Sequence, residues 1–512
     1  MMEKGELKHQ GLSVVTFCYT LAMIAAGSVP DHRGTHFVIG FMDSSSTIPL
    51  KLTLMPRTTS TVSVNITTPL MTPVFSRQIE LTGGNATAIE IPGNVNLRMN
   101  ANSIENKGLY IEASSEIVIY GLNAANSSND PFLALPNDFI GSDYYAVTPE
   151  YTMVDSFSQI GIISTNVGTT NITITLPNAH PLEVEFKGKS YKQGDRIQAQ
   201  LNQFQTLQLT SDSDLTGCRI VSSTPVSLIA GCVSHIDKYS NGTIYTQHIV
   251  EQLYPVSVWG KHFAAIPFSN TADLFRIVSK QSSTTVKMAL KSRNTLKILG
   301  ESQFTELNIS CSGDIYIVIE SSHPIMVIQY SNIGDATQCY MVSVPPIERS
   351  VNYYSFSARM MGHNVLMPST VNIIIDSSYT EGIRVDGSGI PRNSWVMMNN
   401  SGSGPTYSAV QVNINRTGLH DLKHSASDVD FMAISNGLPL GILGETVCDS
   451  TCQKGGSATA APASEGLHPG VLAIIISLCC AVFLVVACIL AFVIVEVTCR
   501  RDGNSKVMPF IG

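Results

Sequence analysis

The stretch Ile220-Val-Ser-Ser-Thr-Pro-Val226-Ser-Leu228 decides the fold, because the chain holds three versions of it. The other two are Ile111-Glu-Ala-Ser-Ser-Glu-Ile117-Val-Ile119 and Ile319-Glu-Ser-Ser-His-Pro-Ile325-Met-Val327. Their spacing indicates a repeated unit of about 100 residues, which is typical of duplicated domains rather than of a short-period solenoid. We interpret the Ser-Ser-x-Pro step between two β-branched runs as a hairpin turn.

Other parts of the chain repeat in step with this stretch. Aromatic-rich segments follow the three versions: DFIGSDYYAVTP from Asp138, SVWGKHFAAIPF from Ser257 and ERSVNYYSFSA from Glu348. GTHFVIGF at Gly34 opens the first unit, and DVDFMAISNG from Asp428 is a weaker fourth version of the end of the unit. The repeat thus runs through most of the chain before residue 436.

Alternation of apolar and polar residues predicts strands within each unit. Val62-Ser-Val-Asn-Ile66, Ile172-Thr-Ile-Thr-Leu176 and Val410-Gln-Val-Asn-Ile414 all have this period of two, with turn-forming residues between such runs. No long amphipathic helix pattern occurs before residue 470. We predict an all-β protein of tandem β-sandwich-like repeats followed by one transmembrane α-helix, with a β-propeller-like ectodomain as the alternative.

The two ends of the chain have targeting patterns. Residues 1–28 carry two lysines before a short apolar stretch, as a signal peptide does, and a retained N-terminal anchor is the alternative. Residues 471–497 form an apolar segment long enough to cross a bilayer as a helix, and Arg500 and Arg501 follow it. The expected protein is a single-pass type I protein of the plasma membrane, with an extracellular N-terminus. Its expected parts are the signal 1–28, an N-terminal β module 29–130, a β region 131–435, a stalk 436–470, the helix 471–497 and a cytosolic tail 498–512.

Composition points to the secretory route and away from nucleic acid. Charged residues make up 14% of the chain and the net charge is -8, with no basic run in the ectodomain to bind phosphates. Eight N-x-S/T sequons lie between the signal and the apolar segment, and we predict glycosylation there. They begin at Asn65, Asn85, Asn126, Asn171, Asn241, Asn308, Asn399 and Asn415.

Six of the eleven cysteines lie in the expected ectodomain, where an oxidising compartment favours disulfides. If a hairpin turn is centred near Pro225, Cys218 and Cys232 lie opposite each other and can form a disulfide. Cys311 and Cys339 straddle Pro324 in the same way. Cys448 and Cys452 then remain for a small local loop, or for a bridge between two chains.

The runs Phe132-Leu-Ala-Leu-Pro-Asn-Asp-Phe-Ile-Gly-Ser-Asp-Tyr-Tyr145 and Gln247-His-Ile-Val-Glu-Gln-Leu-Tyr-Pro-Val-Ser-Val-Trp-Gly-Lys-His-Phe263 resemble the IgGFc-binding protein N-terminal domain. The resemblance covers roughly residues 130 to 435. It implies a secreted or surface binding module, associated in mammals with mucus and with the Fc part of immunoglobulin G. The chain departs from that family in context, because it lacks cysteine-dense tandem modules and adds the apolar segment. No binding residue can be carried over from the family.

The sequence holds no familiar catalytic signature, and we predict no enzyme, no cofactor and no metal site. His248 and Glu251 could serve metal or acid–base chemistry on a helix, but in a strand they point to opposite faces. The acidic run Ser211-Asp-Ser-Asp-Leu-Thr-Gly217 fits a turn as well as a calcium loop. Trp259 and Phe263 fit core packing better than a ligand platform.

Two functions of different classes remain. The first is cell-surface recognition or adhesion, in which β modules bind an extracellular protein or glycoprotein. The second is a membrane-tethered structural component of a mucus-like or extracellular coat, which mainly self-associates. An ectoenzyme ranks third. The sequence alone leaves the ligand, the binding face and the oligomeric state open.

Overall fold

Each version of the repeated stretch lies inside a single long strand in the computed structural model. These strands are β7 (Leu109–Ala124), β16 (Arg219–Lys238) and β23 (Ile317–Ile333). The predicted hairpin turn is therefore wrong, because β16 continues through Pro225 and β23 through Pro324. β-Branched residues on both sides keep the chain extended, and the proline is tolerated where the ladder is interrupted.

A bulge marks the position of the Ser-Ser step in each long strand. In the second unit β16 advances from Val221 to Val226, while its partner β9 advances only from Asp143 to Gly141. The same shift occurs in the first and third units. The unpaired residues of a bulge bend a strand, and here the bend carries the long strand from one group of partners to another.

The fourth residue of each stretch, Ser114, Ser223 or Ser322, explains why serine recurs there. Its hydroxyl accepts a hydrogen bond from a backbone N–H on the neighbouring strand in all three units. The three bonds are Ser63 N to Ser114 Oγ at 3.0 Å, Asn171 N to Ser223 Oγ at 2.9 Å and Thr285 N to Ser322 Oγ at 2.9 Å. The hydroxyl thus satisfies a backbone donor that the bulge leaves without a ladder partner.

The structure describes residues 30–443, except 43–49, 58–59, 84–85, 98–101, 125–128, 150–156, 239–243, 269–271, 311–312, 334–339, 358–368, 400–404, 417 and 436–437. They form four repeated units. The first unit contains β1 (Gly34–Ile39), β2 (Leu50–Pro56), β3 (Val62–Thr67), β4 (Ser76–Leu81), β5 (Thr87–Ile91), β7 and β8 (Asn129–Ala134). β3 and β1 pair with the first half of β7, and β2 and β8 pair with its second half.

The second and third units repeat this arrangement. The second contains β9 (Gly141–Tyr145), β10 (Ser158–Ser164), β11 (Thr169–Thr175), β14 (Arg196–Asn202), β15 (Thr206–Ser211), β16 and β17 (Ile244–Gln252), with β6 (Ile104–Glu105) added at its edge and a separate hairpin of β12 (Glu183–Phe186) and β13 (Lys189–Lys192). The third contains β18 (Gly260–Ala265), β19 (Ala272–Ser279), β20 (Thr284–Leu290), β21 (Asn294–Leu299), β22 (Phe304–Ser310), β23 and β24 (Tyr340–Ser343).

The fourth unit is divided into two sheets. One has the order β25 (Tyr353–Ser357), β31 (Leu419–His424), β27 (Ile383–Val385) and β28 (Ser388–Gly389). The other has the order β29 (Val396–Met398), β30 (Tyr407–Ile414), β26 (Ser369–Asp376), β32 (Met432–Ser435) and β33 (Leu438–Pro439). Short 3-10 turns connect elements at Gly93–Val95, Val256–Val258, Ile347–Arg349, Ser377–Gly382 and Arg392–Ser394.

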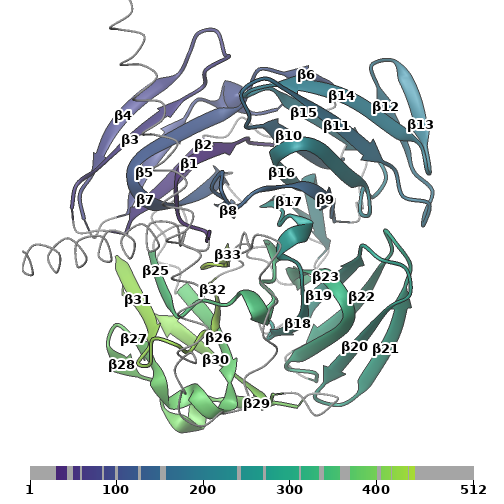
Figure 1. The fold of residues 1–512 in the computed structure, drawn as a ribbon. Helices are drawn as coiled ribbons and strands as arrows, with labels where there is room; N and C mark the ends of the chain where they lie inside the picture. The colour runs from purple at the N-terminus through teal and green to yellow at the C-terminus, as the bar shows by residue number, and fades with distance from the viewer. Residues whose placement is uncertain are drawn as a thin grey trace, which may run out of the picture. The chain divides into compact units, whose positions relative to one another are not determined.

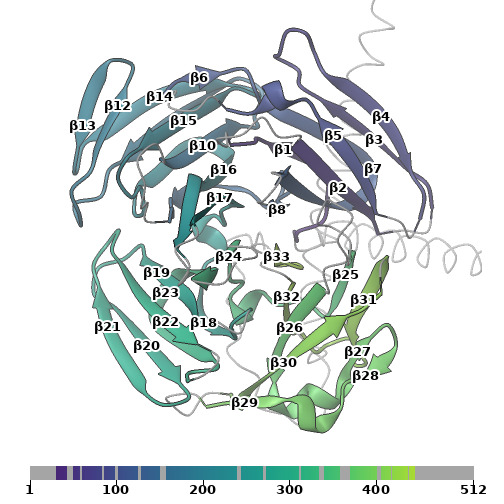
Figure 2. The same cartoon turned by 180° about the vertical axis from the view of Figure 1, so that it is seen from behind.

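The four units are arranged in a ring, with β8, β17, β24 and β33 toward its middle (Figures 1 and 2). The two ends of the described chain meet in the fourth unit. The N–H of His32 donates to the carbonyl of Ile442 at 3.1 Å, and Asp31 forms a β-bridge with Leu443. The ring is thus closed by residues about 410 positions apart.

Each of the first three units closes by a contact between its first strand and the proline that ends it. A Cβ atom placed on Gly260 would lie 2.2 Å from the Cβ of Pro346, closer than real atoms approach. Gly141 stands in the same relation to Pro255. Only glycine fits at such a position, which explains Gly34 in GTHFVIGF and the glycines of the first two aromatic-rich segments, Gly141 and Gly260.

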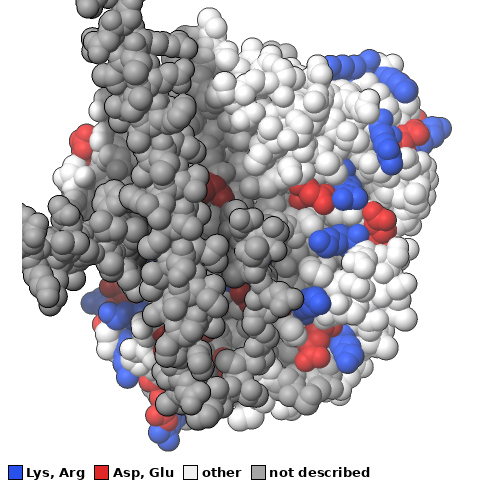
Figure 3. Space-filling view, in the orientation of Figure 1, with Lys and Arg blue, Asp and Glu red and all other residues white. Residues whose placement is uncertain are grey.

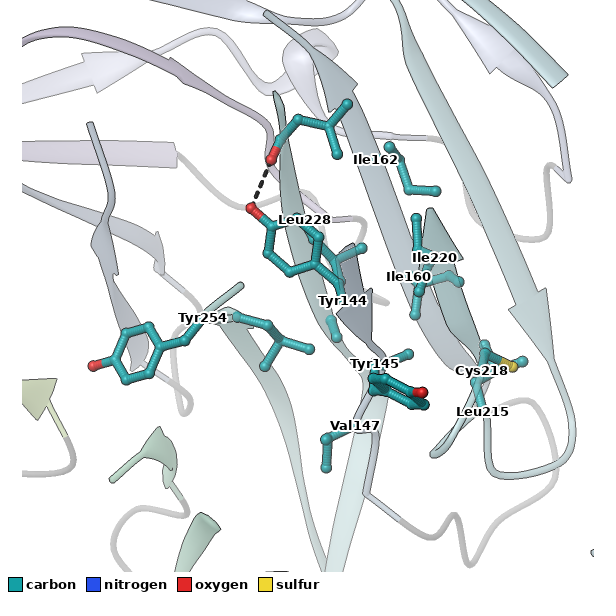
Figure 4. Close-up of a cluster of buried hydrophobic side chains, with 14 of the residues drawn as sticks. Tyr144, Tyr145, Val147, Ile160, Ile162, Leu215, Cys218, Ile220, Leu228 and Tyr254 are labelled. Carbon is teal, nitrogen blue, oxygen red and sulfur yellow. Dashed lines mark hydrogen bonds between the residues drawn. The ribbon is translucent and has the colours of Figure 1, made fainter. Parts of the chain in front are cut away.

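Apolar side chains fill the inside of each unit. Figure 4 shows Tyr144 among Ile160, Ile162 and Leu228 of the second unit. The Tyr144 hydroxyl donates to the carbonyl of Val226 at 2.8 Å and accepts from the N–H of Gly141 at 2.8 Å. The repeated aromatic residue therefore fixes the first strand to the long strand beyond its bulge, with its polar atom satisfied.

Two predictions need correction. The part of the chain that the structure describes contains no helix long and apolar enough to cross a bilayer. The predicted fold class, which ended in a transmembrane helix, is wrong in that respect, and the described residues are all-β. The single-pass plasma-membrane location depended on the same helix and is not retained. Residues 1–28, 471–497 and 498–512 lie outside the described residues, whereas β33 extends the fourth unit beyond residue 435, where we predicted its end.

Candidate functional site

A pocket of about 410 Å³ opens in the fourth unit. This size lies within the usual range for small-molecule sites. Its polar lining comes from β30 and the hairpin of β27 and β28, and includes Ser388, Ser394, Gln411 and Asn413. Between them lie apolar side chains such as Val410. The pocket thus combines neutral hydrogen-bonding groups with apolar surface.

A tight turn builds one wall of this pocket. Asp386 and Gly387, both with positive φ (48° and 79°), join β27 to β28 as a two-residue hairpin loop. The Asp386 carboxylate accepts from His420 Nδ1 at 2.8 Å, from the Arg416 guanidinium at 2.8 Å and from the N–H of Asp421 at 3.0 Å. The Asp-Gly pair is a hairpin signal that the sequence offered and our predictions missed.

The charges in the pocket compensate one another. Burial alone would raise the pKa of Asp386, but the hydrogen bonds from His420 and from the Asp421 N–H hold it below its usual value. Arg416 is paired with the same carboxylate. The wall therefore offers an ordered polar network rather than a net charge, and this favours a neutral, hydroxyl- or amide-bearing ligand over an ion.

One predicted glycosylation site lies in the same pocket. Asn415 is exposed and lines the opening next to Arg416. A glycan on Asn415 would therefore stand at the edge of the pocket. Of the other sequons, Asn65, Asn171, Asn308 and Asn399 are exposed, whereas Asn85, Asn126 and Asn241 lie outside the described residues. Glycosylation stays a prediction at all eight.

His248 and Glu251 lie buried on β17 and point to different neighbouring units. His248 Nε2 accepts from the side-chain amide of Asn123 at 2.8 Å, in the first unit. Glu251 Oε1 accepts from the N–H of Ser343 at 3.1 Å, in the third unit. The next residue, Gln252, accepts from the N–H of Leu135 at 3.1 Å. The two candidates therefore connect units and do not form one chemical site.

Burial shifts the pKa of both groups toward the neutral form. It lowers the pKa of His248 to about 4 and raises the pKa of Glu251 to about 8. Glu251 Oε2 is buried without a hydrogen-bond partner, as are the hydroxyls of Tyr120 and Tyr254. A carboxylate would be costly in this surrounding, so Glu251 holds its proton at neutral pH.

The acidic run at Ser211–Gly217 serves an ion pair. Asp214 accepts from the Arg276 guanidinium of the third unit at 2.8 Å, and Arg276 also donates to Glu306 at 2.8 Å. Arg276 is 1% exposed, and its guanidinium lies 4.5 Å from the centre of the Phe304 ring. Because Asp214 is committed to this pair, the turn interpretation fits the run better than a calcium loop.

The hairpin argument for a disulfide between Cys218 and Cys232 is wrong, whereas the disulfides of the other four cysteines stay predictions. Cys218 is a buried free thiol just before β16, and Cys232 lies on β16 itself, opposite Ser158 and Ile249. A continuous strand separates them along its length, so the argument from a hairpin does not hold for this pair. Cys311, Cys339, Cys448 and Cys452 lie outside the described residues. Trp259 and Phe263 are buried, at 6% and 2% exposure.

The described residues contain no cluster of three or more His, Cys, Asp or Glu side chains that could hold a metal ion. Several of their buried charged and polar groups, such as His248, Glu251 and Arg276, connect neighbouring units.

The chain belongs to the IgGFc binding protein family, whose model matches residues 130–437. It is also similar to the human IgGFc-binding protein, with 26% identity over 210 residues. That similarity covers 41% of this chain and 4% of the human protein, so the chain spans a small part of the relative's length. The resemblance inferred from the sequence is confirmed.

Proposed function

We propose that this chain is an extracellular recognition protein that binds a protein or glycoprotein ligand. The observation that carries the proposal is the family match, which runs from β8 of the first unit to the end of the fourth. His248, Glu251 and Arg276 form hydrogen bonds or ion pairs between units. Because these side chains connect units, they support binding rather than catalysis. Adhesion between cells is one form that such recognition can take.

The binding experiment uses the full chain as the soluble partner against immobilised ligands. Immunoglobulin G Fc is the first ligand, since the similar human protein is named for it. A mucin-type glycoprotein is the second, and bovine serum albumin is the negative control. Binding to Fc or to the mucin above the albumin level supports the proposal. If the folded chain binds neither Fc nor the mucin, the proposal is overturned.

The pocket of the fourth unit is our candidate for part of the binding surface. Ser388→Trp would fill it from the exposed hairpin, and Gln198→Trp places the same ring on an exposed strand of the second unit as a control. We expect the pocket variant alone to weaken ligand binding. Asn415→Gln should strengthen binding if a glycan normally covers the opening.

Self-association into a structural coat is the competing proposal. A strictly monomeric mass in solution across a wide concentration range would exclude it. A concentration-dependent assembly without Fc or mucin binding would favour it instead. The same preparation therefore tests both functions.

A further inference from the structure

The outer edge of the third unit differs from the equivalent edges of the first and second. The serine hydrogen bonds align the three units residue by residue, with Ser63, Asn171 and Thr285 in equivalent positions. The partners of these positions on the edge strands are Glu80, Gln200 and Ile298. The edge strands of the first and second units can therefore be compared, position by position, with the edge strand of the third.

Two apolar side chains stand where the other units have polar ones. On β21, Leu296 and Ile298 are 58% and 69% exposed. The equivalent pair is Gln78 and Glu80 on β4 and Gln198 and Gln200 on β14, all exposed. Leu296 and Ile298 are two residues apart, so both point to the same face of the sheet.

The same face lacks the sequons that the other two units carry. Asn65 lies on β3 and Asn171 on β11, the strands beside the edge in the first and second units. The corresponding strand of the third unit, β20, has Thr285 and Lys287 on this face and no sequon. The third edge would remain uncovered in a glycosylated molecule.

The hairpin of β20 and β21 is basic although the chain is acidic overall. Residues 284–300 contain four basic side chains, Lys287, Lys291, Arg293 and Lys297, and no Asp or Glu. All four are exposed. In Figure 3 the surface over β20 and β21, at lower right, shows a mostly uncharged area with charged side chains of both signs at its margins.

β21 is also the terminal strand of its sheet, since it pairs with β20 alone. A terminal strand offers unpaired backbone groups to an incoming strand. Lysine on such a strand repels a second copy of the same edge but attracts an acidic one. The charges therefore select an acidic partner over self-pairing.

We infer that β21 is a docking edge for an extended acidic segment of a partner protein, which adds to the sheet as a strand and covers Leu296 and Ile298. This inference deepens the proposed recognition function by naming a surface for it. The segment would alternate apolar with Asp or Glu side chains, because alternate residues of a strand face opposite sides. Its apolar row would meet Leu296 and Ile298, and its acidic row would lie on the opposite face, where Lys297 points.

The test uses a biotinylated peptide of alternating valine and glutamate, with a peptide of the same composition in two blocks as control. The wild-type full chain should bind the alternating peptide, more weakly as salt is raised. Leu296→Gln with Ile298→Gln recreates the glutamine pair of the second unit and should lower affinity about tenfold or more. Val167→Gln, at a loop residue 80% exposed, should leave affinity unchanged.

A second variant tests the edge without removing its apolar side chains. Thr285→Asn with Lys287→Thr copies the Asn171-Ile172-Thr173 sequon onto β20. When made in glycosylating cells it should block peptide binding, and enzymatic removal of the glycan should restore most of it. Both variants should unfold at the wild-type denaturant concentration.

Three results would overturn the inference: no preference of the wild type for the alternating peptide, full binding by both variants, or a wild-type dimer that the double glutamine variant dissociates. The last would identify a second copy as the occupant. Fc or mucin binding that survives in both variants is a fourth overturning result, and the recognition function then stands without the docking edge.

Discussion

Replacing Glu251 by glutamine should stabilise the protein at neutral pH. Glu251 is 1% exposed, one of its oxygens has no hydrogen-bond partner, and burial raises its pKa from 4.5 to about 8. The folded chain therefore holds this proton over a pH range in which the unfolded chain releases it. Stability from this group is fully present below pH 4.5 and falls as pH rises toward 8.

The size of the effect follows from the shift. Each pH unit in this window costs about 1.4 kcal/mol, so the free energy of unfolding falls by about 3 kcal/mol between pH 5 and pH 7 through this group alone. A glutamine side chain at this position would keep an oxygen to accept from the N–H of Ser343 and would remove the titration. The difference in stability between variant and wild type should grow by that amount.

Urea unfolding of wild type and Glu251→Gln at several pH values between 5 and 8 measures this difference. All other titrating groups are common to both proteins and cancel in the comparison. Glu90→Gln, at an exposed residue of β5, provides the control and should show a small difference. A constant difference for the Glu251 variant would refute the reasoning.

The remaining predictions concern contacts between and within units. Arg276→Met should lower the free energy of unfolding by about 3 kcal/mol or more in urea titrations, because it leaves two carboxylates without their buried cation. The hydrogen bond between His262 and Glu348 raises the pKa of His262 and, against the effect of burial, lowers the pKa of Glu348. His262→Gln should therefore lower the melting temperature most between pH 4.5 and 6.5, where both groups are charged in the folded and unfolded chain. The loss should shrink at higher and lower pH. Gly260→Ala should destabilise the third unit, seen as faster hydrogen exchange in β18, because its methyl group would collide with Pro346; unchanged exchange would contradict this.

The sequence predicted the β content and the repeat, because both depend on local patterns. Alternation in runs such as Val62–Ile66 sets which side chains face the core, and β3 shows that pattern. The hairpin turn predicted at the Ser-Ser-x-Pro step was wrong because the same residues favour both a turn and a bulge. Whether the chain turns back at this step depends on which strands pair with Val226, and the local sequence does not specify that pairing.

The site was less accessible to prediction than the fold. Asp386-Gly387 is a recognisable hairpin signal, but nothing in the sequence places it beside His420. Arg276 and Asp214 pair across two units, so the acidic run could not be explained before the ring was known. His248 and Glu251 are the exception. They lie three residues apart, so assigning them to a strand was enough to predict that they point to opposite faces.

The meeting of residues 31 and 443 makes the ring a natural candidate for circular permutation. A short linker could join those two neighbours, and new ends could be opened between two units without loss of any strand. Every unit would then have covalent neighbours on both sides except at the chosen cut. Comparing permutants cut at different places would show which junction the assembly tolerates losing.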